Sequence, residues 1–170
     1  MIISQLKHET ITSASQDAFS LYEKSRFGEK KQGYIEYSML EALYLLKNHK
    51  IQVMSSKISL DFPSLLAKAK RLDKRTALKF AVFENLRSRG YIVKTALKFG
   101  AEFRVYPKGM KPGQEHAAWL LHTVKEHETL TWYDFAAKMR VGTSTNKKLM
   151  IAIVDSEDDV TYYEFNWMRP

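Results

Sequence analysis

Two kinds of hydrophobic pattern meet at Gly90, and this change of period constrains the fold more than any other feature. Residues 78–86 carry apolar side chains at helical spacing, every three or four positions. Residues 91–96 and 101–106 instead have the composition of two strands, with a turn at 98–100 between them. Glycine commonly follows the last turn of a helix, because it adopts left-handed backbone conformations without strain. The sequence therefore predicts that a helix ends at Gly90 and that a sheet begins there.

The first half of the chain is predicted to combine short strands and helices. Ser38 lies three residues before Glu41, a spacing typical of the capping box that begins a helix. The elements expected here are one or two strands in residues 1–14, a helix in 15–24, a helix from Ser38 to about Lys47, a strand in 51–54 and a helix opened by residues 61–64. Together they predict a small mixed α/β N-terminal domain.

The second half is predicted to be an α/β unit around one mixed, largely continuous central sheet. Residues 116–124 fit a helix or a strand, and a strand is favoured because the segment is short and its neighbours are strands. The other expected elements are a loop at 107–113, a helix that begins near Thr131 and carries Phe135, Ala136 and Met139, a loop at 142–146, an apolar strand at 148–154 and a final strand from Val160 to about Trp167. The expected fold class is α+β or α/β, with domains of residues 1–84 and 85–170.

Composition restricts both the chemistry and the partners. The chain has 170 residues, with 27 Lys and Arg against 19 Asp and Glu, a net charge of +8. Both halves share the excess, so it is not a basic tail, and it favours a polyanionic partner such as nucleic acid. The absence of cysteine excludes disulfides, thiolate zinc sites and a cysteine nucleophile.

The sequence also predicts a chain without a membrane segment or a signal peptide. No uninterrupted apolar run approaches the about 18 residues that a membrane helix needs. The first residues lack the basic, apolar and cleavage regions of a secretory signal. We therefore expect a cytoplasmic protein with no membrane partner.

Three side chains at the ends of predicted strands are candidates for catalysis. Tyr106, His116 and Lys147 each lie beside a predicted loop, where a rigid strand positions the residue and the loop gives a substrate access. By themselves they leave the question open, because the chain has nine Tyr and five His. Lys147 and Lys148 fit a solvated pair or a phosphate contact. The histidines lack a metal-ligand spacing, and no phosphate-binding glycine loop is present.

Four carboxylates are concentrated at Asp155, Glu157, Asp158 and Asp159, here called the acidic loop. Like charges this close repel one another, which leaves two interpretations. The segment is either a solvated hairpin loop or a plug for a basic cleft on a neighbouring subunit.

Three blocks of the sequence resemble the motifs of the archaeal tRNA-splicing endonuclease family. They are residues 90–106, residues 115–120, and Arg140 with residues 147–155, in the family's order and with its gaps, and residues 40–46 show a weaker likeness. The resemblance implies a nuclease-like C-terminal domain that cuts precursor tRNA at both ends of an intron folded as a bulge–helix–bulge. It also implies 2′,3′-cyclic phosphate and 5′-hydroxyl products, and a reaction without metal or cofactor.

The resemblance implies roles for single residues. Tyr106 is the general base, His116 the general acid, and Lys147 the cation that stabilises the transition state. Histidine suits the role of general acid, because an ordinary pKa of about 6.5 leaves some imidazolium at neutral pH. Tyrosine has an ordinary pKa of about 10, so it needs a positive charge beside it, from Lys147 or Arg104, to act as a base. The alternative is that Tyr106 only positions the 2′-hydroxyl.

Further RNA contacts follow from the same resemblance. Arg140 matches a position that clamps an extruded base by cation–π stacking, with Trp167 either the second jaw of the clamp or a residue buried in an interface. Lys148 is expected to contact RNA as well. Thr145 and Asn146 depart from the Val-Arg of many relatives, which removes one cation beside the site.

The resemblance finally implies an assembly. Family enzymes present two active sites through four domain-sized units, so the chain is expected to form a homotetramer, or a heterotetramer with a related non-catalytic subunit. The acidic loop matches a loop that inserts into a cleft of the opposing subunit, which favours the plug. The final strand is expected to pair edge to edge with a partner.

Two other functions are weighed beside this one. The first is a non-catalytic RNA-binding subunit of the same assembly, against which the intact Tyr106, His116 and Lys147 argue. The second is a metal-dependent nuclease, for which Glu102 and Glu115 are candidate ligands without a convincing spacing.

Overall fold

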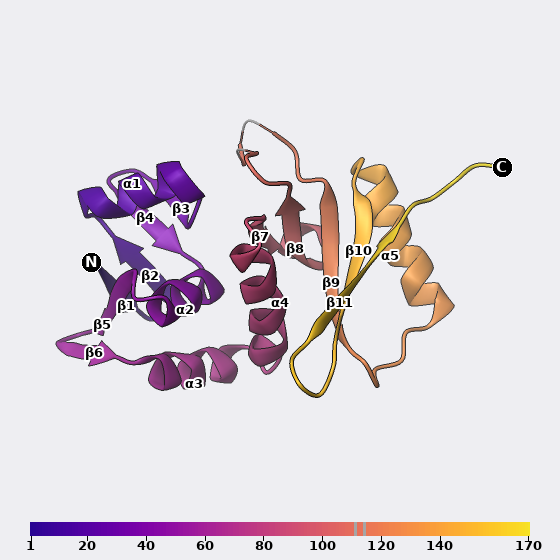
Figure 1. Ribbon diagram of the computed structural model, residues 1–170. Helices are drawn as coiled ribbons and strands as arrows, with labels where there is room; N and C mark the ends of the chain where they lie inside the picture. The colour runs from indigo at the N-terminus through magenta and orange to yellow at the C-terminus, as the bar shows by residue number, and fades with distance from the viewer. Residues whose placement is uncertain (111, 114) are drawn as a thin grey trace. The chain divides into compact units, whose positions relative to one another are not determined.

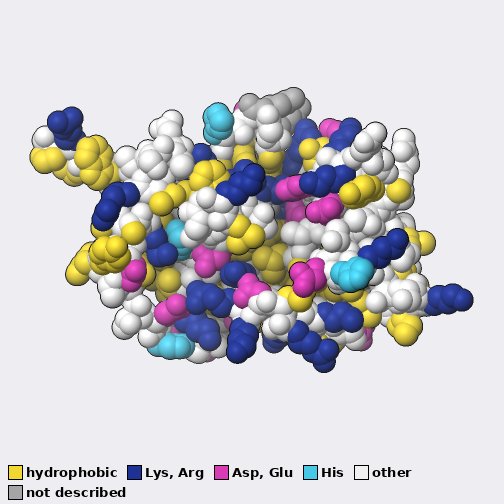
Figure 2. Space-filling model, turned by 180° about the vertical axis from the view of Figure 1, so that it is seen from behind, with side chains coloured by type: hydrophobic (Ala, Val, Ile, Leu, Met, Phe, Trp, Pro, Cys, Tyr) yellow, Lys and Arg dark blue, Asp and Glu magenta, His cyan; other side chains and the backbone are white. Residues whose placement is uncertain are grey.

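The computed structural model describes residues 1–110, 112–113 and 115–170, which form two compact units, Met1–Phe80 and Ala81–Pro170 (Figure 1). Each unit contains a mixed sheet together with helices, so the predicted fold class is confirmed. Among the described helices, none has the length and apolar character needed to cross a membrane. Lys and Arg side chains are spread over the face seen in Figure 2, with Asp and Glu among them, so the positive charge is not confined to a tail.

The first unit forms a six-stranded sheet in the order β3-β4-β2-β1-β5-β6. Its elements are β1 (Ile2–Lys7), β2 (Thr10–Ser13), α1 (Gln16–Ser25), β3 (Glu29–Lys31), β4 (Tyr34–Tyr37), α2 (Met39–Lys47), β5 (Ile51–Ser55), β6 (Ile58–Leu60) and α3 (Phe62–Leu72). β1 and β5 are parallel, and the other neighbouring strands are antiparallel. Buried and exposed residues alternate along β1, as expected for a sheet with one face on a core.

The start of α2 shows why this unit buries a charged residue. Ser38 and Glu41 form the predicted capping box: the Ser38 hydroxyl accepts a hydrogen bond from the Glu41 N–H (3.3 Å), and the Glu41 carboxylate accepts one from the Ser38 N–H (2.9 Å). The second carboxylate oxygen accepts the N–H of Gly28 (2.9 Å). Gly28 has a φ of +79°, and an added Cβ would lie 2.4 Å from the Ile35 side chain. The turn after α1 thus requires glycine, and Glu41 ties it to α2.

The described part of the second unit forms a five-stranded sheet in the order β11-β10-β9-β8-β7. Its elements are α4 (Thr76–Ser88), which begins in the first unit, β7 (Ile92–Ala96), a 3₁₀ turn (Leu97–Phe99), β8 (Ala101–Tyr106), β9 (Trp119–Lys125), α5 (Trp132–Ser144), β10 (Lys148–Val154) and β11 (Val160–Phe165). β9 and β10 are parallel, and the other neighbouring strands are antiparallel. The strand favoured for residues 116–124 is confirmed as β9.

Helices α4 and α5 pack on opposite faces of this second sheet. Phe83 of α4 contacts Phe103 of β8, with ring centres 6.0 Å apart. Val141 of α5 packs against a cluster that includes Leu120 of β9. Phe103 pairs with Leu121, the neighbour of Leu120, and adjacent residues of a strand point to opposite faces. The two sides are called the α4 face and the α5 face below.

Some strand predictions differ from the structure. β3, β4 and β6 were not predicted, because three or four residues are too few to establish a period. The final strand ends at Phe165 instead of near Trp167. Its partner β10 begins at Lys148, and Phe165 pairs with the next residue, Leu149, so the ladder ends there.

The loop predicted at residues 142–146 was wrong in its first part, because α5 continues to Ser144. Glycine, serine and threonine favour loops, but here the Thr145 hydroxyl donates a hydrogen bond to the Val141 carbonyl (2.8 Å) and satisfies the last turn. Gly142 is buried, where the absence of a side chain allows close packing. Tertiary contact has therefore overridden local preference.

Candidate active site

The three predicted catalytic positions all lie at or next to strand ends on one end of the second sheet. β8 ends at Tyr106, whereas β9 and β10 begin at Trp119 and Lys148. Val105 pairs with Trp119, and Trp119 pairs with Lys148. This end of the sheet is called the site edge.

Backbone hydrogen bonds continue beyond these pairs, although the regular register of β8 and β9 ends at Val105 and Trp119. The Ala118 N–H donates to the Val105 carbonyl (3.0 Å), and the Lys148 N–H donates to the Ala118 carbonyl (2.9 Å). The Ala118 N–H bonds to residue 105 instead of residue 106, which is the pattern of a β-bulge at the start of β9, and Tyr106 packs against Ala117. By alternation along their own strands, Tyr106 and Lys147 belong to the α5 face. Neighbouring strands lie about 4.8 Å apart, so the backbones of residues 106 and 147 are about two strand spacings apart.

Tyr106 is fixed by packing. It is 4% exposed and forms a cluster with Ile92 and Ala117, against which Met110 packs. A phenol held in this way has a defined direction before any substrate binds, which is what a residue that receives or orients a proton needs.

His116 differs from Tyr106 in its exposure. It precedes β9, next to the buried Ala117, and its own side chain is exposed. The packed neighbour anchors the backbone and leaves the imidazole in solvent. The His116 side chain is therefore accessible from solvent, although its backbone lies only three residues before the first residue of β9.

Lys147 is positioned by the end of α5. Its N–H donates to the Gly142 carbonyl (2.8 Å), and a Cβ added at Gly142 would lie 2.9 Å from the Lys147 carbonyl oxygen. The Lys147 ammonium donates to the Thr145 carbonyl (2.9 Å) and lies 5.3 Å from the centre of the Phe99 ring. Close helix–strand packing thus holds the lysine, and only glycine permits it.

The backbone at Asn146 adopts a conformation that most residue types disfavour. Its φ is +53°, in the left-handed region that asparagine tolerates better than most residues. It is the turn residue between α5 and β10, next to Lys147. Asparagine therefore suits the turn that leads from α5 to Lys147.

The other two predicted cations near the site lie on different faces. Arg104 belongs to the α5 face, two residues before Tyr106, and its Nε donates to the Thr95 carbonyl (3.0 Å). Lys148 belongs to the α4 face, and its ammonium donates to Glu164 (2.8 Å). Only Arg104 therefore shares a face with Tyr106 and Lys147.

Arg140 and Trp167 line one groove. Its volume is about 780 Å³, and Phe135, Met139 and Met168 contribute apolar walls. Arg140 is exposed, and Trp167 is 63% exposed. A guanidinium and an indole on a shared groove have the chemistry needed to hold a flat base between them.

The acidic loop joins β10 to β11. The Asp155 carboxylate accepts the N–H groups of Glu157 and Asp159, both at 2.9 Å, and Asp158 has a φ of +64°. Asp155 therefore closes the turn. The side chains of Glu157, Asp158 and Asp159 are exposed, and within the described ranges they form no ion pair.

Glu102 and Glu115, the candidate metal ligands, lie in different parts of the second unit. Glu102 lies within the sheet, 3.4 Å from His122, and accepts the Thr123 N–H (3.3 Å). Burial raises the pKa of Glu102, but the hydrogen bond and charge of His122 outweigh it and lower that pKa below its usual value. Glu115 precedes the site edge. The described residues contain no group of three or more His, Asp or Glu arranged to hold a metal ion.

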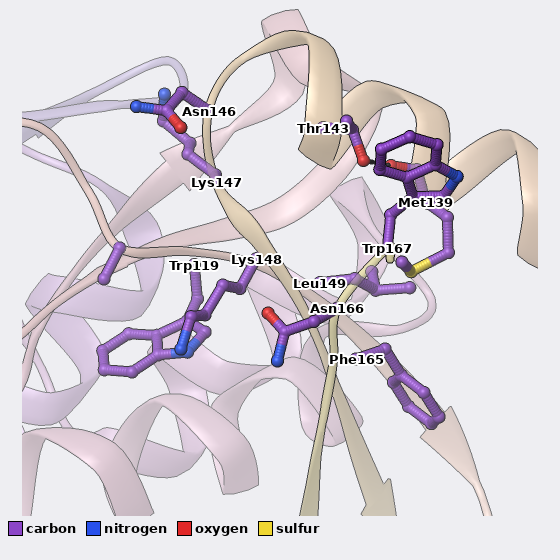
Figure 3. A pocket seen from close by; sticks show the side chains of 11 residues that line it. Trp119, Met139, Thr143, Asn146, Lys147, Lys148, Leu149, Phe165, Asn166 and Trp167 are labelled. Atoms are coloured by element: carbon purple, nitrogen blue, oxygen red, sulfur yellow. Dashed lines mark hydrogen bonds between the residues drawn. The ribbon is translucent and has the colours of Figure 1, made fainter. Parts of the chain in front are cut away.

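Sequence reasoning missed two residues at the site edge, Trp119 and Glu164. Trp119 is one of the residues that line a pocket of about 400 Å³, which Lys147, Lys148 and Asn166 also line (Figure 3). Figure 3 shows Trp119, Lys148 and Asn166 close together. Glu164 accepts a hydrogen bond from the Trp119 indole (2.6 Å). The alternation of side chains along β11 predicts which face of the sheet Glu164 belongs to. It does not predict that Glu164 contacts Trp119, which lies 45 residues away in the sequence.

Comparisons with known proteins cover both units. Residues 76–162 match the family model for the catalytic C-terminal domain of tRNA intron endonuclease, and residues 2–66 match the model for its N-terminal domain. The tRNA-splicing endonuclease of Methanothermobacter thermautotrophicus is 38% identical over 170 residues, covering 98% of this chain and 97% of the relative. That of Thermococcus gammatolerans is 39% identical over 170 residues, covering 99% of each. That of Nanoarchaeum equitans is 38% identical over 141 residues, covering 79% and 90%.

Proposed function

The chain belongs to the tRNA intron endonuclease family and is an endonuclease of tRNA splicing, and we propose that it cuts precursor tRNA at both boundaries of an intron folded as a bulge–helix–bulge. Cleavage leaves a 2′,3′-cyclic phosphate and a 5′-hydroxyl and uses neither metal nor cofactor. The observation that supports the proposal is that Tyr106, His116 and Lys147 lie at or next to strand ends at the same end of one sheet, within the segment that matches the catalytic domain. An intact trio disfavours a non-catalytic subunit.

The proposed chemistry needs only these three side chains and the RNA. Tyr106 receives or orients the proton of the 2′-hydroxyl, whose oxygen attacks the adjacent phosphorus. The bond from phosphorus to the 5′-oxygen breaks, and His116 donates a proton to that oxygen. Lys147 neutralises charge on the non-bridging oxygens in the transition state. Because the nucleophile belongs to the substrate, no water has to be activated.

The Arg140–Trp167 groove supports a clamp for an extruded bulge base. Each side chain offers a flat surface, and the exposure of Trp167 leaves room for a base between them. Such a contact selects RNA by the shape of its bulge, because every base has a face that can stack.

We propose residues 1–84 for assembly and support and residues 85–170 for catalysis, within a homotetramer or a heterotetramer with a related subunit. β11 has a partner on one side only among the described strands, so its free edge suits pairing with another chain. Glu157→Gln, Asp158→Asn and Asp159→Asn together should lower the mass measured by light scattering to that of a dimer or monomer. Asp155 is retained because it closes the turn, and an unchanged mass would contradict the plug.

The proposed function is tested by cleavage of a labelled, intron-containing tRNA precursor with the purified chain in EDTA, followed by analysis of the product ends. Two cuts that leave cyclic phosphates are expected. Cleavage that appears only after addition of a related subunit would establish a hetero-assembly. Absence of cleavage with both chains, or ends other than cyclic phosphate and 5′-hydroxyl, would contradict the proposal.

A further inference from the structure

We propose that Trp119 is a second stacking site for RNA, on the α4 face of the site edge, and that Glu164 holds it in position. The proposal rests on the proposed function and adds a site for an unpaired nucleotide next to the cleaved phosphate. Neither residue takes part in the proton transfers, nor in the Arg140–Trp167 groove.

Two consecutive lysines at the site edge lie on opposite faces of the sheet. Lys147 belongs to the α5 face with Tyr106, whereas Lys148 pairs with Trp119 on the α4 face. The pocket of about 400 Å³ is lined by both lysines and by Trp119, so it extends around the strand ends (Figure 3). An RNA strand whose phosphate lies at Tyr106 and Lys147 reaches Trp119 and Lys148 when it crosses this edge.

Glu164 fixes the orientation of the indole. Its carboxylate accepts hydrogen bonds from Trp119 Nε1 (2.6 Å), Lys148 Nζ (2.8 Å) and Asn166 Nδ2 (3.2 Å). The Lys148 and Trp119 hydrogen bonds lower the pKa of Glu164 to about 2, so it stays ionised at neutral pH. Because these hydrogen bonds already hold the Trp119 ring, little conformational entropy is lost when a base stacks on it, and this favours affinity.

Tyr91 and Lys108 continue the same surface. The rings of Tyr91 and Trp119 meet at 73° with centres 6.2 Å apart, and the Lys108 ammonium lies 5.7 Å from the Tyr91 ring centre. Both rings are half-buried, so packing anchors them while part of each remains accessible. Lys108 is exposed, and 51% of the Lys148 side chain is exposed.

This combination identifies the class of ligand. Aromatic side chains flanked by lysines bind single-stranded RNA, because bases stack on the rings and phosphates meet the cations. A double helix has no free base face to offer. The site therefore takes one unpaired nucleotide of the bulge, with weak preference for base identity.

The first test measures RNA binding by the full-length protein in a His116→Ala background, which separates affinity from cleavage. Trp119→Leu removes the stacking surface, and we expect it to raise the Kd for a bulged RNA about tenfold. Trp119→Phe keeps a ring but loses the hydrogen bond to Glu164, so its Kd should rise about threefold, like that of Glu164→Ala and less than that of Trp119→Leu. Glu164→Ala, a change at a partly exposed position, should raise the Kd about threefold because it releases the indole.

The second test identifies the nucleotide by placing an abasic residue at each bulge position in turn. At one position, the abasic substitution should lower the affinity of the parent about tenfold. The same substitution should not lower the affinity of the Trp119→Leu variant any further. Equal losses in both proteins at every position would overturn the proposal. So would a change in oligomeric mass in Trp119→Leu but not in Trp119→Phe, which would assign Trp119 to a subunit contact.

The outcomes separate this proposal from the proposed function. If the His116-containing enzyme cuts normally but none of the Trp119 variants changes affinity, only the stacking site is wrong. If it binds with the predicted Trp119 dependence yet never cuts, the stacking site stands and the catalytic proposal is wrong.

Discussion

Two carboxylates, one in each unit, hold their surroundings together in different ways. Glu41 of the first unit is 4% exposed and accepts backbone N–H groups of Gly28 and Ser38. Glu164 of the second unit has a side chain that is 36% exposed and accepts three hydrogen bonds from side chains. Backbone donors are placed by the fold itself, whereas side-chain donors at a surface can exchange their partner for a ligand.

The same contrast extends to the two regions around these residues. The corner formed by Gly28 and α2 uses its polar groups to close the fold. The site edge instead combines a packed Tyr106 with a His116 that is exposed to solvent. Substitutions in the first region should therefore change stability, and substitutions in the second should change activity.

The largest expected effect is at the site edge. His116→Ala should slow cleavage by about 10²-fold or more, because it removes the general acid, while RNA binding is retained. Single-turnover cleavage and a binding titration measure the two quantities. His127→Ala, at another exposed histidine, is the matched control and should keep the parent rate. A near-normal rate in His116→Ala would remove His116 from the acid role.

The matching change in the first unit should act on stability. Glu41→Ala leaves two backbone N–H groups without their acceptor, and we expect a loss of about 2–4 kcal/mol in the free energy of unfolding. Denaturant titration measures it, with the exposed Glu9→Ala as the control. Cleavage under conditions where the variant remains folded should be unchanged, and a slowed reaction there would break the contrast between the regions.

Gly142→Ala should separate activity from stability within the second unit. Alanine favours a helix by up to about 1 kcal/mol over glycine, so propensity alone predicts a more stable protein. The added Cβ would lie 2.9 Å from the Lys147 carbonyl, which forces the backbone of this lysine to shift. We expect cleavage to fall about tenfold, with little change in the thermal midpoint. Full activity would show that the position of Lys147 is not critical.

The smallest expected effect is the pH dependence contributed by Glu164. Hydrogen bonds from Lys148 and Trp119 lower its pKa from 4.5 to about 2. Because the pKa is lower in the folded state, the ionised carboxylate stabilises the fold at pH values above its pKa in the unfolded chain, 4.5. This contribution disappears as the pH falls from 4.5 toward 2. Because the group is exposed and screened, the contribution should stay below about 1 kcal/mol. Unfolding measured against pH should show a parent-minus-Glu164→Gln difference that shrinks over this range, and a difference independent of pH would contradict the assignment.

Local patterns predicted much of the fold. The capping box of Ser38 and Glu41 and the turn near Gly90 depend on residues a few positions apart, and both are present. The short strands β3, β4 and β6 were missed because their partners are set by the sheet. The end of α5 was missed because close packing at Gly142 extends a helix through residues that favour a loop.

The candidate site divides in the same way. The sequence alone determined which residues could carry chemistry at strand ends, since Tyr106, His116 and Lys147 lie beside loops and match family motifs. Only the tertiary structure decided that β9 and β10 are parallel and start together next to the end of β8, which places residues 106 and 147 at one end of the sheet. It also decided that Lys147 and Lys148 face opposite sides, and that Glu164 meets Trp119. Strand pairing joins residues far apart in the chain, and no local preference encodes which strands will meet.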